Sequence, residues 1–116
     1  MKDDLLYVGH IHDCIERIEQ YITKGREDFF GNTLVQDAVM RNFGIIGEAA
    51  KKMSEERKCS HPEIPWKKIT GVRDIVIHDY AGIDWNTIWN IIENDLPTLK
   101  SVISDMLREL QNQRKP

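Results

Sequence analysis

The sequence predicts an all-α protein folded as an antiparallel helical bundle, and three observations support this class. Apolar residues recur at spacings of three and four along almost the whole chain, which is the period of amphipathic helices. Short segments containing glycine or proline separate these stretches, so successive helices have little chain with which to turn. The chain has 116 residues, the size of one domain.

The first expected helix covers residues 3–24. Asp3 or Asp4 can cap its start, and Gly25 follows its end. Its apolar stripe consists of Leu5, Val8, Ile11, Ile15, Ile18 and Ile22.

The second expected helix covers residues 33–57, with Asn32 or Thr33 as its N-cap. Gly44 and Gly47 lie inside it, and each costs roughly 1 kcal/mol of helix stability relative to alanine. Close approach of another helix would compensate for that cost. The sequence leaves open whether that helix belongs to the same chain or to a partner.

A third, short helix is expected over residues 66–79. It follows a loop, 58–65, that contains two prolines. Pro65 suits the start of the helix, because proline is tolerated in a first helical turn.

The last helix is expected to begin after Asp84, its N-cap, and Pro97 should kink or divide it near residues 93–97. Trp85 and Trp89 are one turn apart on this helix, and we interpret them as packing residues. Its apolar stripe consists of Ile88, Ile92, Leu96, Leu99, Ile103, Met106 and Leu110.

Composition indicates a single domain over residues 1–110, followed by a polar tail over 111–116. The net charge of −3 argues against a protein that coats nucleic acid non-specifically. Residues 51–73 are nevertheless basic: seven lysines and arginines against three glutamates give +4. This region could attract a phosphodiester, or its charges could simply decorate a solvated surface.

The cellular setting expected from the sequence is a reducing cytoplasm. The chain has only two cysteines, Cys14 and Cys59. Its first residues are acidic and lack an apolar leader, and no apolar run approaches the ~20 residues that span a membrane. We therefore expect no membrane partner.

The candidate chemistry lies between Arg73 and Tyr80. Arg73 offers a donor fork suited to phosphate, and the His78 imidazole can move protons near neutral pH. Five residues separate them, which is ~140° around a helix, so they do not share a face. Asp74 is one turn before His78 and could orient its ring or raise its pKa.

An arginine and a histidine together suit metal-independent RNA cleavage, in which the RNA's own 2′-hydroxyl attacks the phosphorus. Considered alone, these residues fit a plainer reading better: His78 caps the helix and Arg73 forms a surface salt bridge. A metal site is a third possibility, but its candidate ligands match no strong zinc spacing. They are His10, His12, Cys14, Cys59 and His61.

The chain resembles the HepT-like branch of the HEPN domains. Arg73, His78 and Tyr80 match its R-x4-H-x-Y signature, and Asp74 supplies the polar residue that usually follows the arginine. The resemblance extends over nearly the whole chain. Its flanking segments are Ile46-Gly47-Glu48-Ala49-Ala50-Lys51, Pro65-Trp66-Lys67-Lys68-Ile69 and Asn94-Asp95-Leu96-Pro97.

The resemblance implies a four- to five-helix up-and-down bundle that forms a homodimer. Arg73 and His78 would be the catalytic pair of a ribonuclease toxin acting on tRNA or mRNA without a cofactor or metal, and Asp74 would support them. The two copies of the pair would meet at the dimer interface. A minimal nucleotidyltransferase antitoxin would transfer AMP to Tyr80. A non-catalytic helical module that binds nucleotide or docks a partner remains the alternative.

Overall fold

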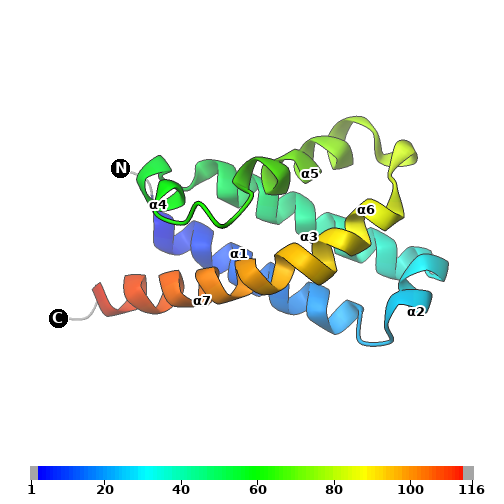
Figure 1. The fold of residues 1–116 in the computed structure, drawn as a ribbon, viewed down its shortest axis with the longest axis horizontal. Helices are drawn as coiled ribbons and strands as arrows, with labels where there is room; N and C mark the ends of the chain where they lie inside the picture. Colours follow the sequence, from blue (N-terminus) through cyan, green and yellow to red (C-terminus); the bar gives the residue numbers. More distant parts are fainter. Residues whose placement is uncertain (1–2, 114–116) are drawn as a thin grey trace.

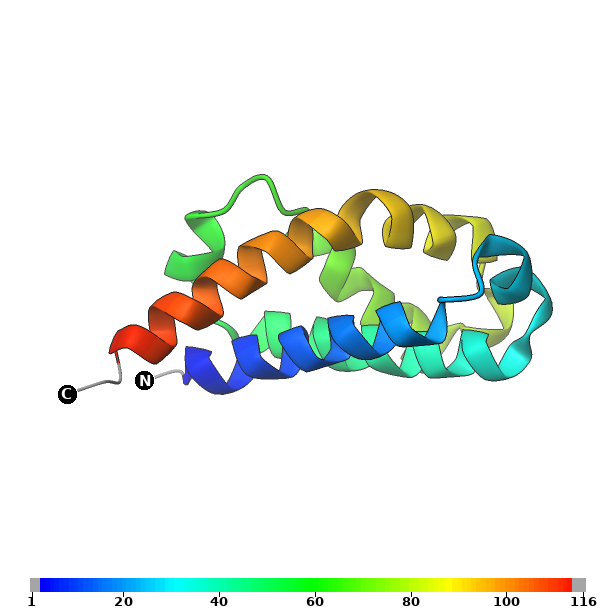
Figure 2. The same cartoon turned by 90° about the horizontal axis from the view of Figure 1, so that it is seen from below.

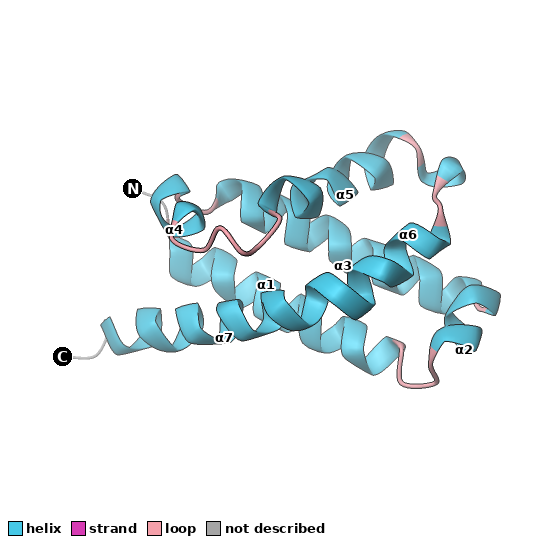
Figure 3. Ribbon diagram, in the orientation of Figure 1, coloured by secondary structure: helices cyan, strands magenta, loops and turns pink. Residues whose placement is uncertain are grey.

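The computed structural model describes residues 3–113, and no strand occurs within them (Figure 3). No helix in this part of the chain is long and apolar enough to cross a membrane. The elements, in chain order, are α1 (Asp4–Tyr21), α2 (Arg26–Gly31), α3 (Thr33–Lys52), α4 (Glu55–Cys59), α5 (Trp66–His78), the 3₁₀ turn η1 (Tyr80–Gly82), α6 (Trp85–Asn90), the π-helical turn η2 (Ile91–Asp95) and α7 (Leu96–Gln113).

The long helices form an up-and-down bundle, as the sequence predicts (Figure 1). α3 packs against α1 on one side and α5 on the other, and α7 returns along α1 (Figures 1 and 2). The caps agree with the prediction. Asp3 accepts a hydrogen bond from the Leu6 N–H, Asn32 caps α3, and Asp84 caps α6.

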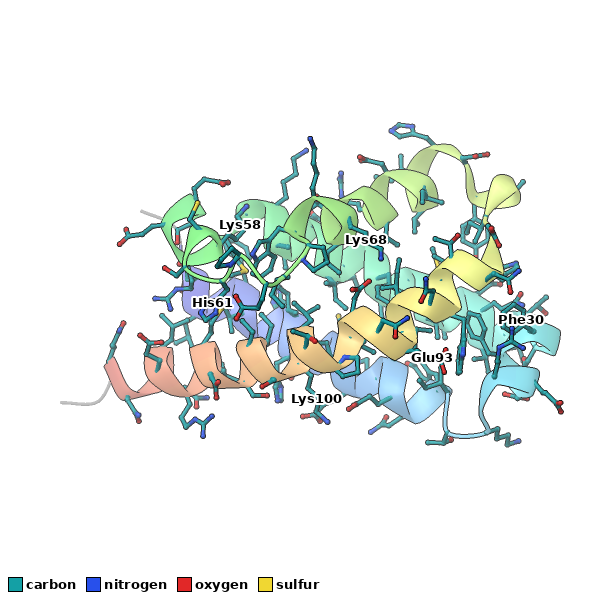
Figure 4. All side chains as sticks on the ribbon, viewed as in Figure 1. Phe30, Lys58, His61, Lys68, Glu93 and Lys100 are labelled. Atoms are coloured by element: carbon teal, nitrogen blue, oxygen red, sulfur yellow. The ribbon has the colours of Figure 1, made fainter. Side chains whose placement is uncertain are left out.

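The core is a continuous apolar interior between α1, α3, α5 and the α6–α7 arm. Phe29 on α2 is fully buried, and its ring lies 5.2 Å from that of Trp89 and 5.8 Å from that of Trp85. Phe30, labelled in Figure 4, adjoins this cluster. The two tryptophans are therefore packing residues, and they hold α2 at one end of the bundle.

The prediction of one helix over 33–57 is wrong, because the helical backbone breaks after Lys52. Ser54 adopts an extended conformation and caps the separate helix α4. Its N–H and hydroxyl donate to the Asp4 carboxylate at 2.9 and 2.7 Å, and Arg57 donates to the same group at 3.2 Å. Burial raises the pKa of Asp4, but these hydrogen bonds outweigh it and lower the pKa below its usual value. The break after α3 is therefore held both by the local cap that Ser54 gives α4 and by its contact with Asp4 at the start of α1.

Pro97 disturbs the last helix where the sequence predicts. Proline has no N–H, and its ring would clash with the carbonyl four residues earlier in a regular α-helix. The chain widens into the π-helical turn η2, where the Leu96 N–H bonds to the Ile91 carbonyl. After this turn the helix continues as α7 as far as Gln113. The expected polar tail, 111–116, thus begins inside α7, and its residues 114–116 lie outside the described residues.

Candidate functional site

α5 carries the Arg73–Tyr80 segment and is anchored at its start. Pro65 immediately precedes the helix, and the Trp66 indole N–H donates to the carbonyls of Lys58 and His61 at 3.0 and 3.1 Å. Figure 4 labels both acceptor residues at this end of the bundle. The helix therefore starts from a fixed point, so its far end projects in a defined direction.

His78 is the last residue of α5. The helix is closed by Asp79, whose N–H bonds to the Ile75 carbonyl, and η1 follows at once. The alternative interpretation expected His78 to cap the helix, but the backbone N–H of Asp79 is the group that does so. The His78 side chain is exposed and forms no hydrogen bond to any other residue within 3–113.

Arg73 is fixed by the closest approach between α3 and α5. A Cβ built on Gly47 would lie 2.8 Å from the Cβ of Arg73 and 3.3 Å from the Ile69 carbonyl oxygen, so any side chain there would force the two helices to shift apart. At Gly44 the nearest atom, on Val76, is 3.8 Å away. The sequence prediction of a close helix approach is correct at Gly47, and the approaching helix belongs to the same chain.

A shallow groove of about 320 Å³ opens beside Arg73 between α3 and α5. Arg73 is half-buried in its wall and, within residues 3–113, forms no ion pair. The surface salt bridge expected by the plainer reading is therefore not formed in this part of the chain. The lining residues are Asp37, Arg41, Gly44, Ile45, Glu48, Arg73, Val76, Ile77 and Tyr80.

Tyr80 reaches the groove from η1 and donates a hydrogen bond to the Asp37 carboxylate on α3. Burial and this hydrogen bond raise the pKa of the Tyr80 hydroxyl to about 12. The phenol therefore stays protonated at neutral pH and acts as a donor. This contact joins the turn after α5 to the first half of α3.

We expect a tyrosine ionisation near pH 12 that Asp37→Asn moves toward the ordinary value of about 10. The folded pKa is raised, so the contribution to stability is complete below pH ~10 and is lost as the pH rises through ~12. Tyrosinate absorbance during a base titration measures the step, and Tyr80→Phe assigns it. A step near pH 12 that survives Tyr80→Phe would show that it belongs to another tyrosine.

Arg73 and His78 do not meet in the groove of one chain. Arg73 lines it, whereas His78 and Asp74 are exposed outside its lining, in agreement with the ~140° offset on the helix. No hydrogen bond joins the side chains of Asp74 and His78 within the described residues. The supporting role of Asp74 stays a prediction.

Much of the basic charge predicted over 51–73 is already engaged. Lys52, Arg57, Lys58 and Lys68 form ion pairs with nearby carboxylates. Lys68 pairs with Asp95 of η2 at 2.7 Å, which ties α5 to the last arm. The charge available to an anion beside the groove is therefore smaller than the sequence count suggests.

The candidate metal ligands of the sequence are dispersed. Cys14 is buried on α1, where burial raises the pKa of its thiol, and Cys59 is exposed on α4. Across residues 3–113, no three histidine, cysteine, aspartate or glutamate side chains are grouped so that they could hold an ion.

Sequence reasoning missed Asp37 and Arg41. A signal for them existed: Asp37, Arg41, Gly44 and Glu48 follow one another at spacings of four, three and four, which is one face of a helix. A polar stripe containing glycine indicates a helix face that carries something other than core. The fold brings this stripe opposite Arg73 and Tyr80.

The arrangement can bind an anion and supply a proton-transfer group nearby. Arginine's planar fork matches the oxygens of a phosphate, and an exposed imidazole can accept or donate a proton. The fold and this site define an all-α helical bundle that carries the segment Arg73–Tyr80 at the end of α5.

Comparison with known proteins gives the family. The family model described as "Ribonuclease HepT-like" matches residues 11–106, and the chain belongs to this family. No solved structure matches.

Three relatives illustrate the similarity. A Thermococcus cleftensis protein named "Probable ribonuclease HepT" is 40% identical, over 81% of this chain and 86% of its own. A "Putative RNase" of Caldanaerobacter subterraneus subsp. tengcongensis is 34% identical, over 94% of this chain and 98% of its own. A Methanocaldococcus jannaschii protein named "Gamma-glutamylcyclotransferase and putative RNase" is 40% identical over 97% of this chain, which spans about half (51%) of that protein.

Proposed function

We propose that this protein is a metal-independent endoribonuclease, the toxin of a prokaryotic toxin–antitoxin pair. The observation that carries the proposal is Arg73, held in a groove without an ion-pair partner within residues 3–113 while an exposed His78 ends the same helix. Family membership supports the same activity. Two of the relatives match this chain over most of their own length, and their names give RNase activity alone. The cyclotransferase activity is named only for the relative of which this chain spans about half, so the names favour RNase activity for this chain.

The proposed reaction is transesterification within the RNA. The His78 imidazole takes the proton of a 2′-hydroxyl, the O2′–P bond forms, and the P–O5′ bond breaks. The departing 5′-oxygen receives a proton from the imidazolium so formed, which restores the neutral imidazole, and the products are a 2′,3′-cyclic phosphate and a 5′-hydroxyl. Arg73 stabilises the charge that accumulates on the phosphoryl oxygens. The RNA is tRNA or mRNA in this proposal.

A homodimer would complete the site. Arg73 and His78 face different directions in one chain, so a two-fold axis near the end of α5 could bring one chain's arginine to its partner's histidine. Exposed apolar side chains suit such an interface: Ile77 lines the groove and is 53% exposed, and Leu34, near the start of α3, is 82% exposed. Dimer formation stays a prediction, measured by sedimentation at several protein concentrations.

The proposed ribonuclease should cleave RNA in EDTA. We expect products with cyclic phosphate and 5′-hydroxyl ends, because the nucleophile is the RNA's own hydroxyl. An oligonucleotide whose 2′-hydroxyls are all replaced by hydrogen is the matched control and should remain intact. Cleavage that stops in EDTA, or that proceeds on the deoxy control, would overturn the mechanism. Binding of RNA without any cleavage would favour the alternative of a non-catalytic module that binds nucleotide or docks a partner.

Control by a partner nucleotidyltransferase is the second part of the proposal. Tyr80 is 40% exposed and lines the same groove as Arg73. Transfer of AMP from ATP would esterify this oxygen, release pyrophosphate and place a negative charge where RNA phosphate is expected to bind. Co-expression with a small nucleotidyltransferase encoded beside this chain, followed by peptide mass analysis, tests this. Suppressed toxicity without an added AMP on Tyr80 would mean that neutralisation works by contact.

A further inference from the structure

The groove contains two carboxylates and two guanidinium groups, and they are not paired with one another. Asp37 accepts the Tyr80 hydrogen bond, and Glu48 pairs with Lys52 at 3.3 Å. Arg41 and Arg73 line the same groove, and neither is within ion-pair distance of a carboxylate in the part of the chain described. Two unpaired cations in one groove favour an anion bound between them.

The absence of an ion pair between Asp37 and Arg41 is informative. The two residues are four apart on α3, so they share a face at the spacing at which opposite charges on a helix ordinarily attract. The structure has no ion pair between them, and one of the two Asp37 carboxylate oxygens accepts a hydrogen bond from the Tyr80 hydroxyl instead. Arg41 is exposed on the groove side of α3.

We infer that Arg41 is a second phosphate-binding residue of the groove and that Tyr80 keeps it available by holding the Asp37 carboxylate through a hydrogen bond. The inference rests on the proposed function, because it takes the anion to be an RNA phosphodiester. Arg73 on α5 and Arg41 on α3 then hold adjacent phosphates from opposite walls. Tyr80 contributes through Asp37, as a positioning residue.

This arrangement adds a consequence to modification of Tyr80. A tyrosine whose oxygen is esterified has no proton to donate, so the hydrogen bond to Asp37 is lost. The carboxylate, no longer held by Tyr80, can then turn to pair with Arg41. Modification would therefore withdraw Arg41 from RNA binding, in addition to placing a phosphate in the groove.

Binding of a short, fluorescent single-stranded RNA tests the inference, with the full chain carrying His78→Ala so that the RNA survives. We expect Arg41→Ala to weaken RNA binding by about ten-fold, because losing one hydrogen bond between charged groups changes an equilibrium constant by roughly that factor. The slope of log affinity against log salt should fall by about 0.7, as for one lost phosphate contact. Arg108→Ala is the control: it removes the same charge from an exposed position on α7, outside the groove, and should leave affinity within about two-fold.

A double substitution tests the part played by Tyr80. Tyr80→Phe frees Asp37 to pair with Arg41, so we expect binding several-fold weaker than with Tyr80 present. Asp37→Asn combined with Tyr80→Phe removes the competing carboxylate and should restore the affinity. Equal weakening in the single and double variants would show that the Tyr80 hydroxyl contacts RNA directly, and the role given to Asp37 would be wrong. Helical circular dichroism checks that each variant is folded.

The outcomes separate the inference from the proposed function. If the wild-type chain cleaves RNA while Arg41→Ala binds it as tightly as its parent, the inference fails and the ribonuclease proposal stands. If the wild-type chain cleaves nothing but Arg41→Ala loses RNA affinity, the ribonuclease proposal fails and the binding role of Arg41 stands. No measurable RNA binding by the parent overturns the inference.

Discussion

Replacing His78 with alanine is expected to reduce RNA cleavage by roughly 10²–10⁴-fold, the usual contribution of a positioned general acid or base. The loss should appear mainly in kcat, because the imidazole acts on the reacting proton rather than on RNA binding. Thermal stability should stay within about 0.5 kcal/mol of wild type, because the side chain is exposed and forms no hydrogen bond within residues 3–113. Single-turnover rates and a melting curve measure the two quantities.

His10→Ala provides the matched control, since it removes an exposed histidine from α1. It should cleave RNA at the wild-type rate. If His78→Ala also cleaves at that rate, His78 is not the proton-transfer group and the reaction needs another base.

Arg73→Lys tests the arginine. It keeps the positive charge but loses the paired N–H donors of the guanidinium group, so RNA cleavage should fall although a cation remains.

Mixing two inactive variants tests whether the site is shared between chains. In a dimer of one Arg73→Ala chain and one His78→Ala chain, a shared site would leave one intact combination of arginine and histidine. Activity should therefore reappear on mixing. Mixtures that stay inactive, although the variants exchange subunits, would place both catalytic residues in the same chain.

The second large effect is expected from Gly47→Ala. An added Cβ would lie 2.8 Å from the Arg73 Cβ, which cannot swing away because it is attached directly to the backbone of α5. α5 must shift away from α3, at a cost of about 1–3 kcal/mol for overpacking. RNA cleavage should also fall, because the shift moves Arg73 in the groove wall. Chemical denaturation gives the stability, and cleavage at a temperature where the variant is folded gives the activity.

Gly9→Ala is the control for helix propensity. Gly9 lies inside α1, and a Cβ there would meet no atom within 4 Å outside its own helical surroundings. Alanine should therefore stabilise the protein by up to about 1 kcal/mol. If Gly47→Ala were as stable as Gly9→Ala, the close approach of α3 and α5 would not be as tight as the structure has it.

The fold was largely predictable because helical periodicity and capping are local properties. The caps at Asp3, Asn32 and Asp84 depend on neighbours within three residues, so the sequence locates them. Pro97 disrupts its own helix for the same reason. The end of α3 was missed although part of its signal is local, since Ser54 caps α4 by accepting from the Arg57 N–H. The hydrogen bonds of Ser54 to Asp4, fifty residues away, are the part that no local pattern specifies.

The candidate site was predictable in part. Arg73, His78 and Tyr80 lie within one short segment, so a motif could reveal them. Asp37 and Arg41 lie more than thirty residues earlier, and their relation to the motif depends on how α3 packs against α5. The pattern that they form on α3 could have suggested a functional face but not its partner.

The sequence by itself therefore determined the long helices, most of their caps and the chemical groups at the end of α5, because each depends on residues close together in the chain. The short helices α2 and α4 were not predicted. The tertiary structure alone decided which groups meet. Gly47 allows α3 and α5 to approach, and that contact fixes Arg73 in a groove wall and brings the Tyr80 hydroxyl to Asp37. Pairing across distant segments depends on the packing of whole helices, which no local pattern specifies.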